Sequence, residues 1–460
     1  MIFQKRIPKI LRTRGRLQRS LSMLGVAFAL LAPGSVSALS IERVVSAGGI
    51  EAWLARDKSV PVISVKILFR GSGSAVDPKG KEGLAHLVSG LLDEGAGPLD
   101  SQHFRQTLEE NAISLRFDAG RDDFSGSLKT LRENREIAFD LLRLALVAPR
   151  FDKPAIERIR NQVLTSLAHL ENDPDAIAQR IWLRTAFPNH AYGKQRRGTE
   201  KSLHAIDAPA LRDFARRHLA RENLIVGVAG DISPAELGPL LDQTFGALPA
   251  RPKNKTPLGD AVVKGKGDVT VIEKPIPQSV ITFGQIGVKR TDPDYYAAYV
   301  MTHLLGGGMG SRLMKEIREK RGLAYYVYST LQPLDRVGLL MGRLATRNDR
   351  AALALELVRA EWKRMAETRV SKTELADAKT YLTGAFPLSL DSTSRVAGVL
   401  IAIQKNRLGI DYLTRRNAYI AAVTVEDVAR VARRLLKPDV LNVVIVGKPE
   451  GLTSPAPATE

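Results

Sequence analysis

The sequence predicts an α+β protein built from two copies of one domain in tandem. A pattern of apolar strand, polar loop and helix with a glycine-rich end occurs in residues 62–97 and again in residues 279–308. Both halves end in a similar apolar strand, within residues 222–233 and 440–450. The 460 residues also exceed one ordinary hydrophobic core. We therefore expect a pseudo-symmetric pair of domains with a cleft between them.

The individual elements follow from the spacing of apolar residues. Residues 62–70 alternate, with Ile63, Val65, Ile67 and Phe69 on one face, which predicts a strand. Pro154 sits where the first residue of a helix is expected. The predicted helices of the first half span 83–97, 101–112, 131–148, 154–171 and 233–248. In the second half we predict a strand at 279–288 and a helix at 295–308.

Residues 249–268 are rich in Pro, Gly and Lys and show no periodicity, which indicates a linker. The segments predicted in chain order are a signal peptide (1–38), a first domain (41–248), the linker (249–268), a second domain (269–450) and a disordered tail (451–460).

The N-terminal segment has the pattern of a secretory signal peptide. Seven basic residues precede a short apolar run, and the small residues Val36 and Ala38 follow. This predicts cleavage after Ala38, export to the periplasm and no stable membrane insertion afterwards. An uncleaved anchor is the alternative, but the apolar run is shorter than the roughly 20 residues that a membrane span needs.

Charge and composition exclude several classes of site. The formal net charge is +19, and removal of the seven basic residues before position 39 leaves +12. Because the remaining basic residues are interspersed with acidic ones, we expect no nucleic-acid partner. The chain has no cysteine, so disulfides and thiolate ligands are impossible, and a metal would need His, Asp or Glu.

The helix predicted at 83–97, "GLAHLVSGLLDEGAG", carries part of a metal-binding pattern. Positions i, i+3 and i+4 share one face of a helix, which places His86, Ser89 and Gly90 together, opposite an apolar stripe. A hydrolytic zinc site needs imidazole and carboxylate ligands and a general base. Serine and glycine supply none of these groups.

This stretch resembles the H-x-x-E-H motif of the pitrilysin (insulinase) family of zinc metallopeptidases, in the subgroup of the processing peptidases. Similar stretches are "GSGSAVDP" before the helix, "NDPDAIAQRIWLRTAFPNHAYGKQRRGT" after it and "HLLGGGMGSRLMKEIREKRGLAYYVYS" in the second half. The resemblance covers roughly residues 41–450. It implies two α/β-sandwich domains, each with a mixed, mainly antiparallel sheet flanked by helices.

The resemblance also implies that the zinc site is degenerate. The family's third ligand, a glutamate, matches Ser166, and a supporting acidic residue matches Ile159. Of three ligands and one base, His86 alone remains, so we expect no metal and no cofactor in this chain. Glu157 and His169 are possible substitute ligands, but their spacing from His86 does not favour them.

In the second half the family's arginine and tyrosine, seven positions apart, match Arg318 and Tyr325. The resemblance implies that they support the transition state in a partner's active site. Tyr326 competes with Tyr325, because neighbouring strand residues point to opposite faces. Gly306, Gly307 and Gly308 match a flexible loop near the substrate entrance, and we expect them to end the preceding helix.

These observations predict a non-catalytic subunit, inactive alone, of an exported heterodimeric zinc metallopeptidase. Its partner would carry H-x-x-E-H and the zinc, and its substrates would be peptides. The main alternative is a periplasmic peptide-binding or scaffold protein without peptidase activity. A metallopeptidase with unconventional ligands is a third possibility.

Overall fold

The computed structural model describes residues 40–253 and 258–453. The described residues all belong to one compact unit. The predicted signal peptide and residues 454–460 of the predicted tail lie outside the described residues. Among the described helices, none alone has the length and apolar composition needed to cross a bilayer. Only the bent pair Lys372–Leu390 and Thr393–Lys405, at 119°, passes by those two criteria.

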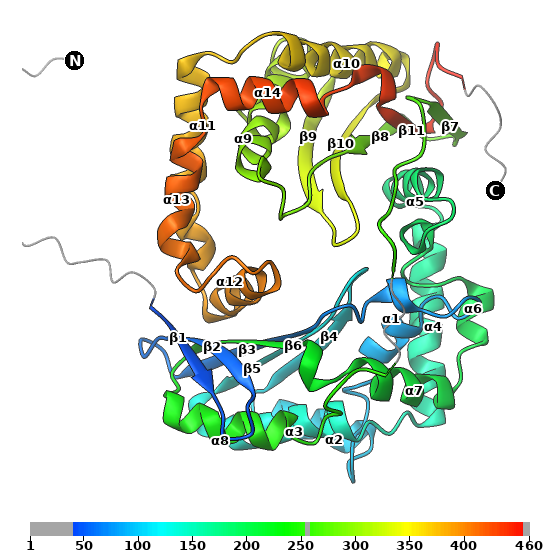
Figure 1. Ribbon diagram of the computed structural model, residues 1–460. Coiled ribbons are helices and arrows are strands. Elements are labelled where there is room, and N and C mark those ends of the chain that lie inside the picture. The colour runs from blue at the N-terminus through cyan, green and yellow to red at the C-terminus, as the bar shows by residue number, and fades with distance from the viewer. Residues whose placement is uncertain (1–39, 254–257, 454–460) are drawn as a thin grey trace, which may run out of the picture. The chain divides into compact units, whose positions relative to one another are not determined.

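The strands form two sheets (Figure 1). The first has the order β1-β2-β6-β3-β5-β4 and the second has the order β7-β11-β8-β10-β9. The strands are β1 (Ile41–Val45), β2 (Glu51–Arg56), β3 (Val62–Phe69), β4 (Ser114–Ala119), β5 (Phe124–Leu131), β6 (Leu224–Gly230), β7 (Val269–Glu273), β8 (Gln278–Ile286), β9 (Ala324–Pro333), β10 (Gly338–Arg347) and β11 (Asn442–Gly447).

Helices occupy most of the remaining chain. They are α1 (Leu84–Ser89), α2 (Ser101–Glu110), α3 (Arg135–Val147), α4 (Lys153–Leu170), α5 (Pro174–Ala186), α6 (Glu200–His204), α7 (Ala208–His218), α8 (Pro234–Phe245), α9 (Tyr295–Gly306), α10 (Ala351–Glu367), α11 (Lys372–Gly384), α12 (Thr393–Lys405), α13 (Tyr412–Ala422) and α14 (Val425–Leu435). A π-helical turn, η5 (Met314–Glu319), precedes β9.

The two sheets repeat one topology. Without β1, each sheet has five strands. Numbered along the chain, they lie across the sheet in the order first, fifth, second, fourth, third. The first and fifth strands pair in parallel in both sheets, and the other neighbours are antiparallel. This confirms the predicted fold class of two α+β units with mixed, mainly antiparallel sheets. The exact domain boundaries stay a prediction.

Strand β3 is buried on both faces. Its residues Ile63, Val65, Ile67 and Phe69 are at most 2% exposed and belong to the main core of the first half, as the alternation predicts. On the opposite face, the hydroxyl of Ser64 lies 2.8 Å from that of Thr393, at the start of α12. The second face is therefore covered by a helix from the other half of the sequence.

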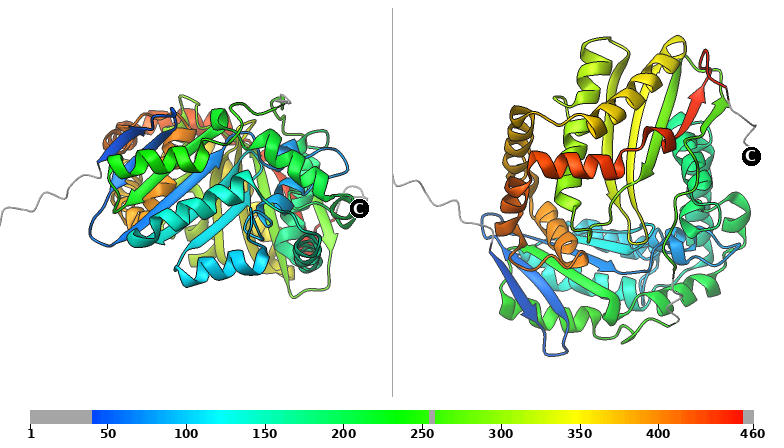
Figure 2. Two further views of the ribbon diagram at one scale, coloured as in Figure 1. Left: turned by 90° about the horizontal axis from the view of Figure 1, so that it is seen from below. Right: turned by 45° about the horizontal axis from the view of Figure 1, so that its top comes forward.

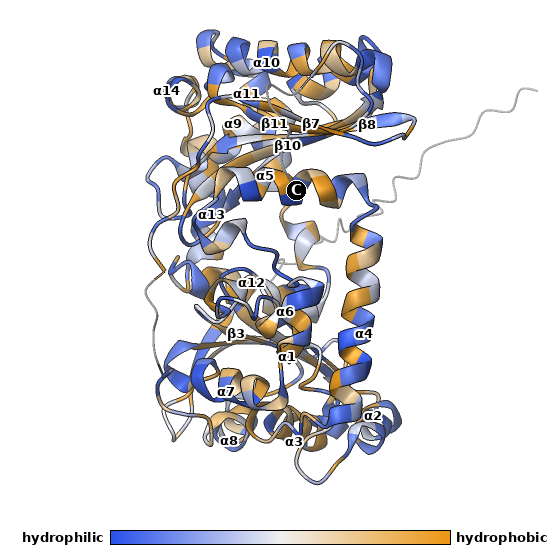
Figure 3. Cartoon of the chain, turned by 90° about the vertical axis from the view of Figure 1, so that its right-hand side faces the viewer, coloured by the Kyte–Doolittle hydropathy of each residue, from blue (hydrophilic) through white to orange (hydrophobic). Residues whose placement is uncertain are grey.

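The two halves exchange helices in this way. Helix α12 packs on β6 and β3, where Leu400 joins a cluster with Ala55 and Ala229. Helix α5, from the first half, packs on β11 and β8, where Trp182 joins a cluster with Val444. Figure 1 shows α12 against the first sheet and α5 beside the second, and Figure 2 shows both helices in two further orientations. Figure 3 shows apolar stretches along α5 next to the second sheet.

Two predicted helices are shorter in the structure. The helix expected at 83–97 ends at Ser89, because Gly90 opens a series of turns in which the N–H of Leu91 donates to the carbonyl of Val88 at 3.0 Å. The helix expected from residue 131 begins at Arg135, since β5 runs to Leu131.

The predicted linker is partly packed. Ala261 is buried, and the N–H of Lys264 donates to the carbonyl of Ala186 at 2.8 Å. Those contacts tie the segment to the end of α5.

Candidate functional site

The short helix α1 is fixed at its N-terminus by a buried carboxylate. Asp77 accepts hydrogen bonds from the N–H groups of Gly83 at 2.8 Å and Ala85 at 2.9 Å. Gly83 has a φ of +93°, and a Cβ there would meet the carbonyl of Arg197 at 2.6 Å. Burial raises the pKa of Asp77 to about 7. The start of α1 is therefore held tightly against the chain around residue 197.

His86 lies half-buried on α1, and its Nδ1 has no hydrogen-bond partner in the described part of the chain. Burial, followed by the positive charges of Arg197 and Arg196, lowers the pKa of His86 to about 4. The imidazole is therefore neutral at physiological pH. Two guanidinium groups, rather than carboxylates, dominate its surroundings.

Ser89 and Gly90 both bond to the carbonyl of His86, but they occupy packed positions rather than a solvent-exposed polar face. Ser89 is 4% exposed, and its hydroxyl donates to the carbonyl of His86 at 2.8 Å. At Gly90 a Cβ would lie 3.1 Å from Cγ2 of Ile159 on α4. Ile159 thus fills the space next to Gly90. Ser89 and Gly90, at which this chain differs from the family's motif, are therefore packed against neighbouring residues.

Ser166 faces a cation instead of binding one. Its hydroxyl accepts a hydrogen bond from Nη1 of Arg197 at 3.0 Å. A zinc ion near Ser166 and His86 would be repelled by this guanidinium and would have one imidazole as its only strong ligand. The residues present therefore do not fit zinc.

The substitute ligands are not assembled either. Glu157 forms an ion pair with Arg160 at 2.7 Å, and half of its side chain is exposed to solvent. Among the described residues there is no group of three or more His, Asp or Glu side chains able to hold a metal ion.

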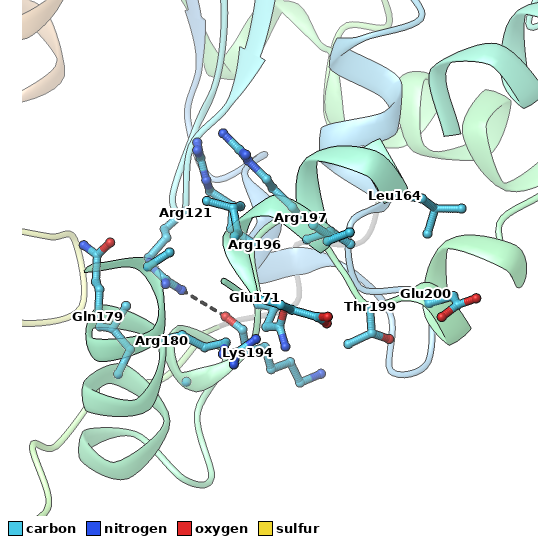
Figure 4. Close-up of a pocket in the computed structure, with 17 residues that line it drawn as sticks. Arg121, Leu164, Glu171, Gln179, Arg180, Lys194, Arg196, Arg197, Thr199 and Glu200 are labelled. Atoms are coloured by element: carbon cyan, nitrogen blue, oxygen red, sulfur yellow. Dashed lines mark hydrogen bonds between the residues drawn. The ribbon is translucent and has the colours of Figure 1, made fainter. Parts of the chain in front are cut away.

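A basic cavity of about 540 Å³ adjoins the degenerate site (Figure 4). Its walls come from α4, α5 and the segment before α6. Its basic side chains are Arg121, Arg180, Lys194, Arg196 and Arg197. Sequence reasoning did not identify these residues. The adjacent arginines of "KQRRG" were the available signal, but only the fold turns them towards His86.

In the second half the structure brings Arg318 and Tyr325 together. The guanidinium carbon of Arg318 lies 5.0 Å from the centroid of the Tyr325 ring, within the range of a cation–π contact. Tyr325 is 79% exposed, and its hydroxyl has no hydrogen-bond partner among the described residues. By contrast, the Tyr326 ring lies 5.3 Å from the guanidinium carbon of Arg343 and stacks on Tyr328.

The three glycines end α9, as predicted. The N–H of Gly307 donates to the carbonyl of His303 at 2.9 Å. A Cβ on Gly306 would lie 2.5 Å from Oγ of Ser329, so the chain passes β9 too closely for any side chain. Gly306, Gly307 and Gly308 line a second cavity of about 520 Å³, together with His303 and several tyrosines. Their role as a substrate loop stays a prediction.

Two family models match the chain. Residues 54–200 match "Insulinase (Peptidase family M16)", and residues 205–382 match "Peptidase M16 inactive domain". A Helicobacter pylori protein named "Non-peptidase homolog YmxG" is 31% identical over 340 residues, which are 73% of this chain and 77% of that protein. A Bacillus subtilis "Uncharacterized zinc protease YmxG" is 23% identical, covering 87% and 96%.

Among solved structures, the peptidase M16 inactive domain from Pseudomonas fluorescens matches 91% of this chain and all of its own. Its TM-score is 0.83 and the sequences are 28% identical. The matches extend across both sheets, and His86 is the one ligand that remains of the zinc-binding pattern in the first half. This chain belongs to the insulinase family, peptidase family M16, as a member with a degenerate zinc site.

Proposed function

We propose that this chain is the non-catalytic subunit of an exported heterodimeric zinc metallopeptidase that cleaves peptides. The proposal rests on one contrast within the chain. The first half has replaced zinc ligands by packed residues and a guanidinium, whereas the second half presents Tyr325 to solvent, with the half-buried Arg318 beside its ring. A relative that carries the name of a non-peptidase homolog supports the loss of intrinsic activity.

The pair suits a role in a site completed by another chain. A tyrosine hydroxyl without an internal partner is free to donate a hydrogen bond to the oxyanion that develops during peptide hydrolysis. The Arg318 guanidinium, held over the ring, positions the tyrosine and carries a charge that suits a peptide carbonyl. The partner would supply H-x-x-E-H, zinc and the attacking water.

The location follows from the sequence of residues 1–38 alone. Its basic start, apolar run and small residues are typical of a signal peptide, so we place the mature chain in the periplasm. The matching H-x-x-E-H subunit would have to be exported to the same compartment.

The test is hydrolysis of a quenched fluorescent peptide library. The chain alone is expected to be silent, and the mixture with the H-x-x-E-H protein encoded nearest to it is expected to be active. In the mixture Tyr325→Phe should lower turnover roughly 10²- to 10³-fold without dissociating the complex, because one oxyanion donor is lost. Tyr326→Phe is the matched control and should change turnover less than about threefold, because that ring is engaged by Arg343 and Tyr328.

Other outcomes decide against the proposal. Equal turnover for Tyr325→Phe and the parent mixture would reject the assigned role of Tyr325. Peptide binding without any stimulation of the partner would favour a scaffold. Chelator-sensitive hydrolysis by the chain alone would overturn the non-catalytic assignment.

A further inference from the structure

The basic cavity beside the degenerate zinc site has an excess of positive charge. Five basic side chains line it, against two acidic ones, Glu171 and Glu200. Lys194 is paired with Glu82 at 3.1 Å, and Arg196 approaches Asp118 at 3.4 Å. The remaining three guanidiniums, of Arg121, Arg180 and Arg197, form no ion pair with a carboxylate in the described part of the chain.

The three guanidiniums differ in how they are held. Arg121 is largely buried and donates to the backbone carbonyl of Tyr192 at 2.8 Å. It also donates to the backbone carbonyl of Lys194 at 3.3 Å (Figure 4). Arg197 donates to the neutral hydroxyl of Ser166. Arg180, half-buried on α5, has no hydrogen-bond partner among the described residues. Partly buried positive charges without counter-charges are unfavourable, so an anion that enters this cavity is stabilised.

The lining also limits the kind of anion. Leu164, Leu167, Leu170 and Leu183 supply an apolar wall, and no Phe, Tyr or Trp is among the described residues that line the cavity. A nucleotide base would therefore find no aromatic partner for stacking. A planar carboxylate on an aliphatic stem matches both the guanidinium forks and the leucine wall.

We propose that this cavity binds a carboxylate of a peptide, supplied by an acidic side chain or by a free C-terminus. The inference rests on the proposed function only in taking a peptide as the ligand. The cavity would anchor the peptide beside the former metal site, where the Arg197 guanidinium now stands.

The test is fluorescence anisotropy with the purified chain and no partner, at 0.15 M salt. One labelled, C-terminally amidated heptapeptide carries a central Glu, a second carries Gln there, and a third is the Gln peptide with a free C-terminus. We expect the Glu peptide, the free-acid peptide or both to bind at least about tenfold more tightly than the amidated Gln peptide. The arm that binds more tightly identifies the source of the carboxylate.

Two variants test whether this difference in affinity between the peptides arises from the cavity. Arg180→Ala removes a half-buried charge on the surface of α5 and should reduce the discrimination to about twofold or less. Arg197→Ala should act in the same direction. Arg216→Ala is the matched control, since its side chain on α7 is 74% exposed, and it should leave the discrimination intact.

Equal affinities for the three peptides would overturn the proposal, as would full discrimination in folded Arg180→Ala and Arg197→Ala. The measurement needs no peptidase partner. A failure of Tyr325→Phe to slow the complex would therefore reject the proposed function and leave this result unchanged.

Discussion

The two halves share one strand order, but they differ at the positions that match the family's functional residues. These positions make internal contacts in the first half, whereas the second half leaves a tyrosine exposed. In the first half Gly90 packs on Ile159, and Ser166 bonds to Arg197, so each changed position has gained an internal contact. In the second half Arg318 and Tyr325 contact each other, while the tyrosine remains 79% exposed. Positions that gained contacts now contribute to stability, whereas an exposed tyrosine contributes little to it and is available to a partner.

Restoring the zinc motif tests most directly whether packing and charge keep a metal ion out of the first half. We expect the variant Ser89→Glu, Gly90→His, Ser166→Glu to bind zinc weakly, because Ile159 blocks the new histidine and the Arg197 charge repels the metal. At roughly 5 Å and an effective dielectric of about 20, the repulsion between a doubly charged zinc ion and one guanidinium is about 7 kcal/mol. Adding Ile159→Ala and Arg197→Ala should raise zinc affinity at least about a hundredfold, measured by competition with a chromogenic chelator. Equal affinities would mean that neither residue protects the site.

The exchanged helices give the next largest effect. Trp182 on α5 is 1% exposed, and its Nε1 donates to the carbonyl of Asn442 at 3.1 Å. Leu400 on α12 is fully buried above Gly227. We expect Trp182→Ala to lower the free energy of unfolding by about 3–5 kcal/mol and Leu400→Ala by about 2–5 kcal/mol, measured by urea denaturation. Losses below about 1 kcal/mol would show that the exchanged helices are not part of the cooperative core.

His86 predicts a dependence of stability on pH. Its pKa is about 4 when folded and about 6.5 when unfolded, so between these values the unfolded chain binds more protons. The stability of the parent chain should therefore fall as the pH drops from about 6.5 towards 4. His86→Asn lacks this penalty and should lose about 1–3 kcal/mol less than the parent between pH 7 and 4.5. Parallel curves for the two proteins would contradict the lowered pKa.

The smallest expected effect on stability comes from two helix N-caps, one in each half of the chain. Helices α7 and α14 precede the last strand of their sheets, and their N-cap residues are Asp207 and Thr424. Each cap side chain accepts a backbone N–H at 3.0 Å. We expect Asp207→Ala and Thr424→Ala each to lower the free energy of unfolding by about 1 kcal/mol, measured by thermal denaturation. A difference above about 1 kcal/mol would show that these two helices are not energetically equivalent.

The duplicated fold and the elements with strong local signals could be predicted from the amino-acid sequence alone. The alternation in β3, the proline near the start of α4 and the glycines after α9 act within a few residues of the chain, so they are visible in one dimension. The loss of the zinc ligands was equally visible, because serine and glycine lack the donor atoms that a metal needs.

The groups that replace the metal and the helices that cover the sheets could not be predicted from the sequence, because they depend on long-range contacts. Arg197 reaches Ser166 from 31 residues away, and the start of α12 meets Ser64 from 329 residues away. No local spacing encodes such contacts, because they depend on how strands pair and how helices cross the sheets. The basic cavity is a result of the same kind: its arginines are scattered in the sequence, and packing of α4 and α5 brings them around one space.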